Sequence, residues 1–114
     1  MKRPDDVARV RHALDAARKI VESTAGWKRE DLDPESLTTL GLIRLLEVVG
    51  EAAGAVTPET QKAHPEIPWR SMSGLRNRLV HGYFDVNLDV VWDTIRNDLP
   101  GVIPKLQKLL EKRT

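Results

Sequence analysis

Apolar residues recur every three or four positions along most of this chain of 114 residues, and no segment alternates apolar with polar side chains. This spacing places the apolar side chains on one face of an α-helix. Near the N-terminus the repeating positions are Val7, Val10, Leu14, Ala17 and Val21. The pattern predicts an all-α protein that buries these faces against one another.

Capping and helix-breaking residues divide the pattern into separate helices. The expected N-terminal caps are Asp5 or Asp6, Asp33 before a proline, Thr57 and Asn87, and the expected helix ends are Gly26 and Gly82. The helices so bounded cover approximately residues 5–23, 34–56, 58–64, 69–81 and 88–112, the last with a kink or restart at Pro100. Because the connections are short, neighbouring helices should run antiparallel. We therefore expect an antiparallel helical bundle of about four main helices plus a short helix.

The length and composition suit one small domain, which we expect to cover residues 1–114. Apolar residues make up 40% of the chain and charged residues 31%, so the core is thin for so many charges. The chain has no cysteine, which excludes disulfide bonds and thiolate chemistry. It starts without the apolar segment of a signal peptide, and no stretch is apolar for long enough to span a membrane. We expect a soluble, cytoplasmic protein.

The predicted helix over residues 34–56 is apolar on more than one side. One face carries Leu37, Leu40, Leu45, Val48, Val49, Ala52 and Val56, and the stripe is widened by Leu42, Ile43 and Leu46. Such a width is expected where a helix meets both the core of its own chain and a second molecule. A homodimer is therefore expected.

The net charge of +1 is unevenly distributed. Basic residues outnumber acidic ones over residues 62–83, and the balance reverses over residues 84–98. Ordinary solvated helix faces would produce this pattern, and so would a local phosphate-binding patch that is doubled across a dimer. Charge alone leaves both interpretations open.

One short segment combines the residue types that RNA cleavage without a metal requires. Arg76 is followed after four residues by His81, and Tyr83 lies two residues further on. A histidine can take up or deliver a proton near neutral pH, at the 2′-hydroxyl or at the leaving 5′-oxygen. An arginine offers paired donors to the charge that develops around phosphorus. A tyrosine hydroxyl can orient the phosphate or the imidazole. These residue types would suit a ribonuclease site, but an arginine and a histidine at an arbitrary spacing more often lie on an ordinary polar helix face, and the three residues alone leave both interpretations open.

Helix geometry restricts how these groups can meet. Arg76 and His81 are about 140° apart around an ideal helix axis, so a single helix does not aim both at one point. Asn77 and His81, four residues apart, lie on the same side. If Gly82 ends the helix, His81 lies in its last turn, where the helix dipole favours the protonated imidazole. Two copies that face each other across a dimer axis would bring all these groups into one cleft.

The segments around this motif resemble the HepT-like branch of the HEPN domains. The matching segments are residues 50–53, 66–70, 74–77, 79, 81, 83–84, 91–92 and 98–100. The resemblance extends over nearly the whole chain and implies a HEPN-like helical bundle that dimerises with both motifs in one cleft. It also implies a metal-independent endoribonuclease without a cofactor. Arg76 and His81 would then be the catalytic pair, Tyr83 would complete the motif, and Asn77 matches the polar residue that commonly follows the arginine.

The same resemblance implies a partner and a mode of regulation. HepT-like proteins are toxins of toxin–antitoxin pairs, and the antitoxin is a small nucleotidyltransferase of the minimal type. In this family the antitoxin can transfer AMP to the motif tyrosine, which corresponds to Tyr83. The added phosphate and adenine would fill the cleft and repel RNA phosphates. The alternative for Tyr83 is a structural side chain that packs beside Phe84.

Several other residues carry weaker signals. Glu47 and Glu51 could hold a metal ion, but two carboxylates without a third ligand indicate a solvated helix face more readily. Glu51 is also a candidate supporting partner of Arg76 or His81. Arg70 and Arg78 would either contact the RNA backbone or simply be exposed.

The remaining histidines and the tryptophans are expected to have structural positions. His12 and His64 should lie at the surface, Trp69 and Trp92 should anchor the core, and Trp27 should cover a loop. The alternative function is a non-catalytic helical binding module that serves a minimal nucleotidyltransferase as its partner or nucleotide-binding subunit. The intact set of Arg76, His81 and Tyr83 favours the ribonuclease.

Overall fold

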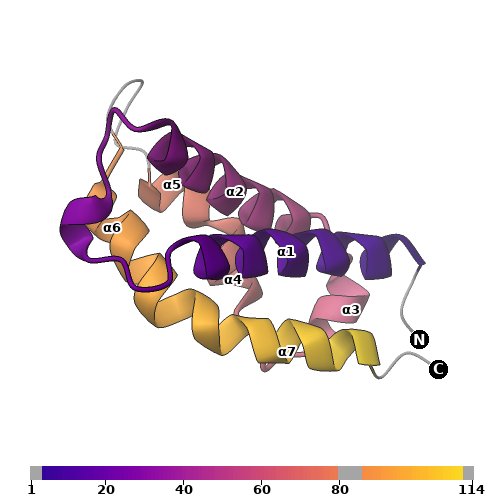
Figure 1. Ribbon diagram of the computed structural model, residues 1–114. Coiled ribbons are helices and arrows are strands. Elements are labelled where there is room, and N and C mark those ends of the chain that lie inside the picture. The colour runs from indigo at the N-terminus through magenta and orange to yellow at the C-terminus, as the bar shows by residue number, and fades with distance from the viewer. Residues whose placement is uncertain (1–3, 80–85, 112–114) are drawn as a thin grey trace.

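A computed structural model of the chain describes residues 4–79 and 86–111, which fold into helices joined by turns and short loops (Figure 1). In chain order the elements are α1 (Pro4–Ser23), the 3-10 turn η1 (Arg29–Asp31), α2 (Leu37–Gly54), α3 (Pro58–Ala63), α4 (Trp69–Ser73), α5 (Leu75–Leu79), α6 (Leu88–Asp93), the π-helical segment η2 (Thr94–Asp98) and α7 (Leu99–Glu111). The predicted all-α bundle is confirmed. No helix in the described ranges has the length and hydropathy needed to cross a membrane.

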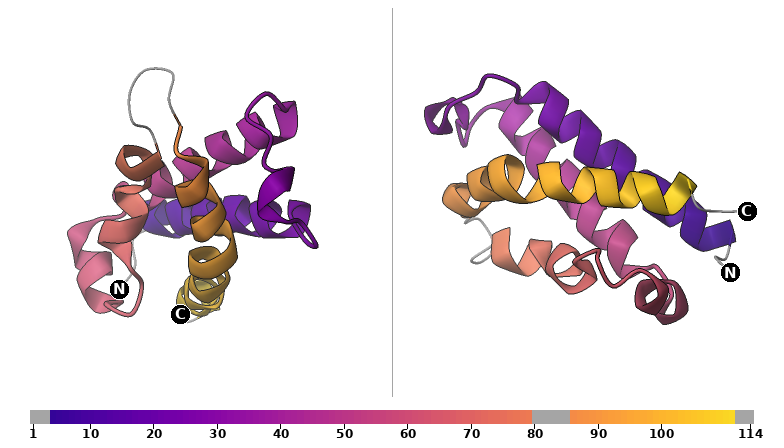
Figure 2. Two further views of the ribbon diagram at one scale, coloured as in Figure 1. Left: turned by 90° about the vertical axis from the view of Figure 1, so that its left-hand side faces the viewer. Right: turned by 90° about the horizontal axis from the view of Figure 1, so that it is seen from below.

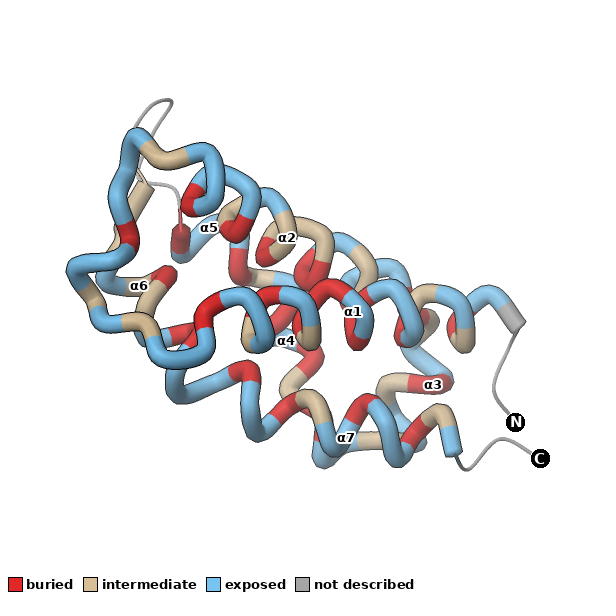
Figure 3. The backbone as a smooth tube through the Cα atoms, viewed as in Figure 1, coloured by how far each residue is buried: buried red, intermediate tan, exposed pale blue. Residues whose placement is uncertain are grey.

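The core lies where α1, α2 and α7 pack together. α1 lies against both α2 and α7, and α7 ends near the start of α1 (Figures 1 and 2). Ile20, Leu46 and Leu106, one from each helix, are completely buried. Figure 3 shows buried residues recurring along these helices between exposed ones, as the spacing of apolar residues predicted. α4 and α5 pack against α2, and α6 packs against α5.

The second long helix begins later than its proline suggested. Ser36 caps α2, with its hydroxyl oxygen accepting hydrogen bonds from the backbone N–H groups of Thr38 (3.1 Å) and Thr39 (3.5 Å). The carboxylate of Asp33 instead accepts a hydrogen bond from the N–H of Glu35, which closes a turn before the helix. The expected start at Pro34 is therefore wrong by one turn, because two side chains able to cap follow each other closely.

The helix expected over residues 69–81 is divided by Gly74. α4 ends there, with the Gly74 N–H donating to the carbonyl of Arg70 at 3.0 Å, and α5 starts at the next residue. α5 is described as far as Leu79, so the predicted end at Gly82 lies outside the described residues.

The C-terminal part of the chain continues through its prolines as one helical run. The side chain of Asn87 accepts hydrogen bonds from the N–H groups of Asp89 and Val90, which confirms the predicted cap of α6. The run does not restart at Pro100. A proline cannot donate to the carbonyl four residues earlier and its ring crowds that group, and the wider π-helical turn just before α7 provides the room.

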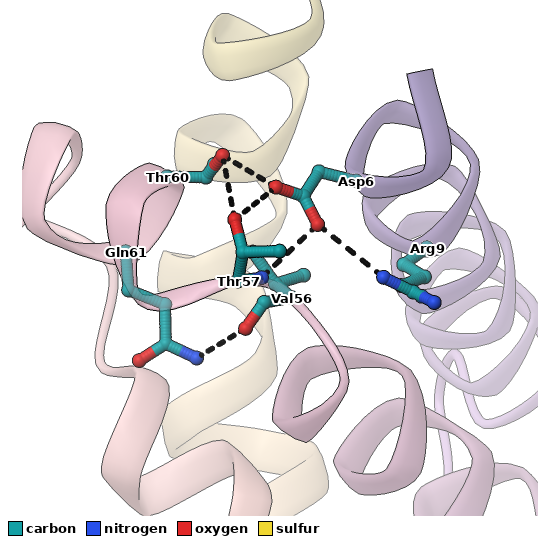
Figure 4. Close-up of polar contacts among 6 residues, drawn as sticks. All are labelled: Asp6, Arg9, Val56, Thr57, Thr60 and Gln61. Carbon is teal, nitrogen blue, oxygen red and sulfur yellow. Dashed lines mark hydrogen bonds and ion pairs between the residues drawn. The ribbon is translucent and has the colours of Figure 1, made fainter. Parts of the chain in front are cut away.

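A buried carboxylate joins the start of α1 to the start of α3 (Figure 4). Asp6 is fully buried, and its oxygens accept hydrogen bonds from the Thr57 N–H (3.0 Å), the Thr57 hydroxyl (2.5 Å) and the Thr60 hydroxyl (2.5 Å). Arg9 lies 3.5 Å from the same carboxylate. Burial by itself raises the pKa of Asp6, but the three hydrogen bonds and Arg9 outweigh it and hold the pKa below its usual value. These hydrogen bonds thus tie the N-terminal end of α1 to the N-terminal end of α3.

Candidate active site

The structure describes the first part of the predicted motif. Arg76 and Asn77 lie on α5 and are exposed, whereas His81 and Tyr83 lie outside the described residues. Leu75 and Leu79, one helical turn apart, are buried against the rest of the bundle and fix the inward face of α5. The polar residues between them are therefore presented to solvent, and the side chain of Arg76 is 72% exposed.

Arg76 is paired with a carboxylate on α2. Its Nε lies 3.6 Å from Oε2 of Glu47, and the Glu47 side chain is only 21% exposed. The other oxygen of Glu47, Oε1, is 3.4 Å from Nη1 of Arg44, which is itself 3.6 Å from Oε1 of Glu51. Basic and acidic groups thus alternate from Glu51 through Arg44 and Glu47 to Arg76. We call these four residues the charged cluster.

The cluster differs in one respect from the expected set of supporting residues. The ion pair of Glu51 within the described residues is with Arg44, and that of Arg76 is with Glu47. A contact of Glu51 with His81 lies outside the described residues, so its supporting role stays a prediction. The sequence offers Glu47 only as a weak candidate metal ligand, and sequence reasoning misses Arg44. Their spacing of three residues on one helix is the signal that could have drawn attention to both.

Small residues on α2 determine how closely α4 and α5 approach it. A Cβ atom added at Gly50 would lie 2.8 Å from the carbonyl oxygen of Met72, and one at Gly54 would lie 3.3 Å from Cβ of Ser73. Ala53, between them, is buried. Only side chains this small let α4 lie so close, and α5 continues directly from α4. The close approach explains why glycines stand at positions 50 and 54, and it holds Arg76 beside Glu47.

A surface depression lies between α5 and α6, next to the motif. It is lined by Asn77, Arg78, Asn87, Asp89, Val90 and Asp93. The guanidinium of Arg78 donates to the carbonyl of Ser71 at 3.1 Å, and Arg29 contacts the Asp89 carboxylate at 2.9 Å. Arg70 is exposed on α4, so both arginines proposed for RNA contact lie at the surface.

The other candidate residues have structural surroundings. His12 is exposed as expected, but the side chain of His64 is mostly buried and lies 3.6 Å from a Glu66 carboxylate oxygen, so its expected surface position is wrong. Trp69 is buried, as predicted, and its indole N–H donates to the carbonyl of His64 at 2.9 Å. The side chains of Trp27 and Trp92 are partly buried. Among the described residues, no three histidine, aspartate or glutamate side chains are grouped closely enough to hold a metal ion.

Comparison with known proteins shows which family the chain belongs to. Residues 13–111 match the family described as ribonuclease HepT-like. The chain belongs to the HepT-like family. It is 40% identical over 80 residues to "Probable ribonuclease HepT" of Thermococcus cleftensis, covering 70% of this chain and 73% of that protein. It is 31% identical over 101 residues to "Putative RNase TTE0752" of Caldanaerobacter subterraneus subsp. tengcongensis, covering 89% and 90%.

No solved structure matches this chain. The resemblance inferred from the motif segments is confirmed by the HepT-like match, and membership of a ribonuclease family supports ribonuclease activity. The matched region includes the whole of the Arg76 to Tyr83 motif as well as the charged cluster.

Proposed function

We propose that this HepT-like protein is a metal-independent endoribonuclease whose site is formed by Arg76, His81 and Tyr83. The observation that carries the proposal is the placement of Arg76. Its guanidinium is exposed to solvent at the start of the motif, while its Nε is paired with a largely buried carboxylate on a neighbouring helix. An arginine that is both anchored and accessible suits the recognition of a phosphodiester.

The reaction is an internal transfer of the phosphoryl group. The 2′-oxygen attacks the adjacent phosphorus while the bond to the 5′-oxygen breaks, which leaves a 2′,3′-cyclic phosphate and a 5′-hydroxyl. The proton of the 2′-hydroxyl must be removed and a proton must reach the leaving oxygen, and His81 is the motif residue suited to one of these transfers. Arg76 stabilises the additional negative charge on the phosphorane oxygens. Tyr83 orients the phosphate or the imidazole.

The active form is a homodimer in which the two motifs line one cleft. Support comes from the start of α2, where the side chains of two large apolar residues are exposed, Leu37 at 86% and Leu40 at 50%. Exposed leucines on one face of a helix favour association with another protein surface. A twofold arrangement would also answer the angular separation that an ideal helix would give Arg76 and His81.

The biological role that fits this reaction is that of a toxin in a toxin–antitoxin pair. The resemblance to HepT-like toxins supports a minimal nucleotidyltransferase as antitoxin, and transfer of AMP to Tyr83 as the means of inactivation. Arg70 on α4 and Arg78 on α5 are exposed and can contact the RNA backbone, while Asn77, which follows Arg76, supports the catalytic pair.

The test is cleavage of total RNA by the purified protein in the presence of EDTA. The wild type should cut RNA to products with 2′,3′-cyclic phosphate ends, and His81→Ala should abolish cleavage while leaving the helical content unchanged. Arg76→Ala should reduce the rate by about a hundredfold or more, as removal of an oxyanion donor does, and Arg76→Lys should restore it only in part. If the His81→Ala variant cuts at the wild-type rate, the assignment is wrong. A wild type that never cuts RNA but binds the nucleotidyltransferase would favour the non-catalytic module.

A further inference from the structure

Within the charged cluster, Glu47 is paired with Arg76 although it lies outside the motif of Arg76, His81 and Tyr83. We propose that Glu47 is a positioning residue, which anchors Arg76 through Nε so that the outer edge of the guanidinium faces the RNA phosphate. The inference rests on the proposed ribonuclease function. Three features of the cluster support it: the difference in burial between the two partners, the nitrogen that is engaged, and the second cation at the carboxylate.

The two partners differ in how firmly they are held. Glu47 lies between Leu46 and Val49, both completely buried, near the middle of a helix of 18 residues, and its own side chain is 21% exposed. Arg76 is 72% exposed at the start of a helix of five residues. A free arginine side chain carries about 2 kcal/mol of rotamer entropy, which must be lost when it binds a phosphate. A rigid carboxylate that restricts Arg76 beforehand reduces this loss.

The engaged nitrogen determines which edge of the guanidinium is available. Glu47 approaches Nε of Arg76, at 3.6 Å. The edge formed by the two terminal nitrogens lies on the opposite side of the guanidinium carbon from Nε and is not the edge that Glu47 approaches. That edge presents two parallel N–H donors, which is the arrangement that binds two phosphate oxygens at once. An anchor at Nε therefore orients Arg76 without occupying the donors that the reaction needs.

The second cation keeps the anchor stable while RNA is bound. Arg44 lies 3.4 Å from Oε1 of Glu47, on the opposite oxygen from the one that Arg76 approaches. When the terminal nitrogens of Arg76 bind a phosphate, the positive charge of its guanidinium is shared between the phosphate and Glu47. Arg44 supplies Glu47 with a second positive partner and so offsets the repulsion between this partly buried carboxylate and the incoming anion. Arg44 thus allows Glu47 to hold Arg76 while RNA is bound.

The first experiment measures whether Glu47 acts through Arg76. Glu47→Gln retains the size of the side chain but removes its charge, and it should lower kcat by about tenfold to a hundredfold, the effect of a misplaced catalytic group, with a smaller change in KM. In the Arg76→Ala background the same substitution should cause no further loss, because the group that it positions is absent. Glu22→Gln, the same change at an exposed residue of α1, is the matched control and should match the wild type.

The second experiment does not depend on activity, and its decisive measurement uses the wild type alone. NMR relaxation of the arginine Nε–H groups in the RNA-free wild type should show Arg76 to be more restricted than Arg70, which is exposed on α4. In Glu47→Gln this difference should disappear. If the Arg76 Nε–H of the wild type is as mobile as that of Arg70, the anchor does not exist and the inference is overturned, whether or not the variant folds.

The outcomes separate this inference from the proposed function. Cleavage at the wild-type rate by Arg76→Ala would refute the assignment of Arg76 to the ribonuclease site. An inactive Arg76→Ala together with a fully active Glu47→Gln would leave the ribonuclease intact and refute the role of Glu47. An equal loss caused by Glu47→Gln in both backgrounds would also refute it, because the residue would then act independently of Arg76.

Discussion

Removing the buried carboxylate of Asp6 should destabilise the protein by an amount that depends on pH. Asp6 accepts three hydrogen bonds from Thr57 and Thr60 and lies 3.5 Å from Arg9 (Figure 4). In Asp6→Asn the two hydroxyls and the N–H compete for one side-chain oxygen. The new NH2 group is itself a donor, so it cannot accept a hydrogen bond from any of them. At least one buried donor is then left without an acceptor.

The expected magnitude follows from the contacts that are lost. A hydrogen bond to a charged group contributes about 1.5–3 kcal/mol, so a loss of one to two of them gives a destabilisation of about 3 kcal/mol. A domain of this length has a free energy of unfolding of about 5–15 kcal/mol, so the variant should fold but melt about 10 °C lower. Asp5→Asn removes an exposed carboxylate one residue away and should cost less than about 1 kcal/mol.

The dependence on pH tests whether the charge is the cause. Because the pKa of Asp6 is lower in the folded protein than in the unfolded chain, its ionisation stabilises the fold above the unfolded pKa. That contribution is lost as the pH falls through the folded pKa. Thermal melts of wild type and Asp6→Asn should therefore differ by a constant amount from neutral pH down to about 5. The difference should begin to shrink only below about pH 4, the ordinary pKa of an aspartate in an unfolded chain, and continue to shrink as the pH falls further. A gap that stays constant down to pH 2, or no gap at neutral pH, would refute this account.

Three further predictions concern the site and its assembly. Gly50→Ala should cost about 1–3 kcal/mol in thermal unfolding and slow RNA cleavage, because its Cβ would lie 2.8 Å from the Met72 carbonyl, whereas Gly101→Ala has open space and should do neither. The double substitution Leu37→Glu and Leu40→Glu should convert a dimer of twice the 12.9 kDa chain to a monomer in light scattering and abolish cleavage; an active monomer would contradict the shared cleft. Co-expression with the cognate nucleotidyltransferase should add AMP to Tyr83, detected by peptide mass spectrometry, and Tyr83→Phe should remain unmodified; AMP on another residue would refute the assignment.

The start of a helix could be predicted from the sequence where only one residue is able to cap it. Asn87 is followed by two N–H groups that its side chain can reach, and α6 starts there. The start of α2 was not fixed in this way, because Asp33 and Ser36 can both cap a helix and the sequence does not rank them. The break at Gly74 depends on how α4 packs against α2. The spacing of residues within positions 69–81 carries no information about that contact.

The motif residues can be picked out from the sequence, whereas the contacts of Arg76 cannot. Arg76 stands out because its spacing to His81 matches a motif, which is information contained in one short segment. The pairing with Glu47 depends on the distance between α2 and α5, which is set by Gly50 and the carbonyl of Met72. No local pattern links those residues, so spacing on α2 could equally suggest Glu51. Only the packing of the helices distinguishes the two carboxylates.

One stripe of α2 connects the proposed dimer to the proposed site. The exposed Leu37 and Leu40 are followed at intervals of four, three and four residues by Arg44, Glu47 and Glu51, so all five lie along the same side of the helix. A second molecule that covers the leucines would therefore lie next to the cations that flank Glu47. Leu37 and Leu40 and the charged cluster are thus consecutive parts of one surface of α2, and this continuity favours a dimer whose interface would extend into the proposed active site.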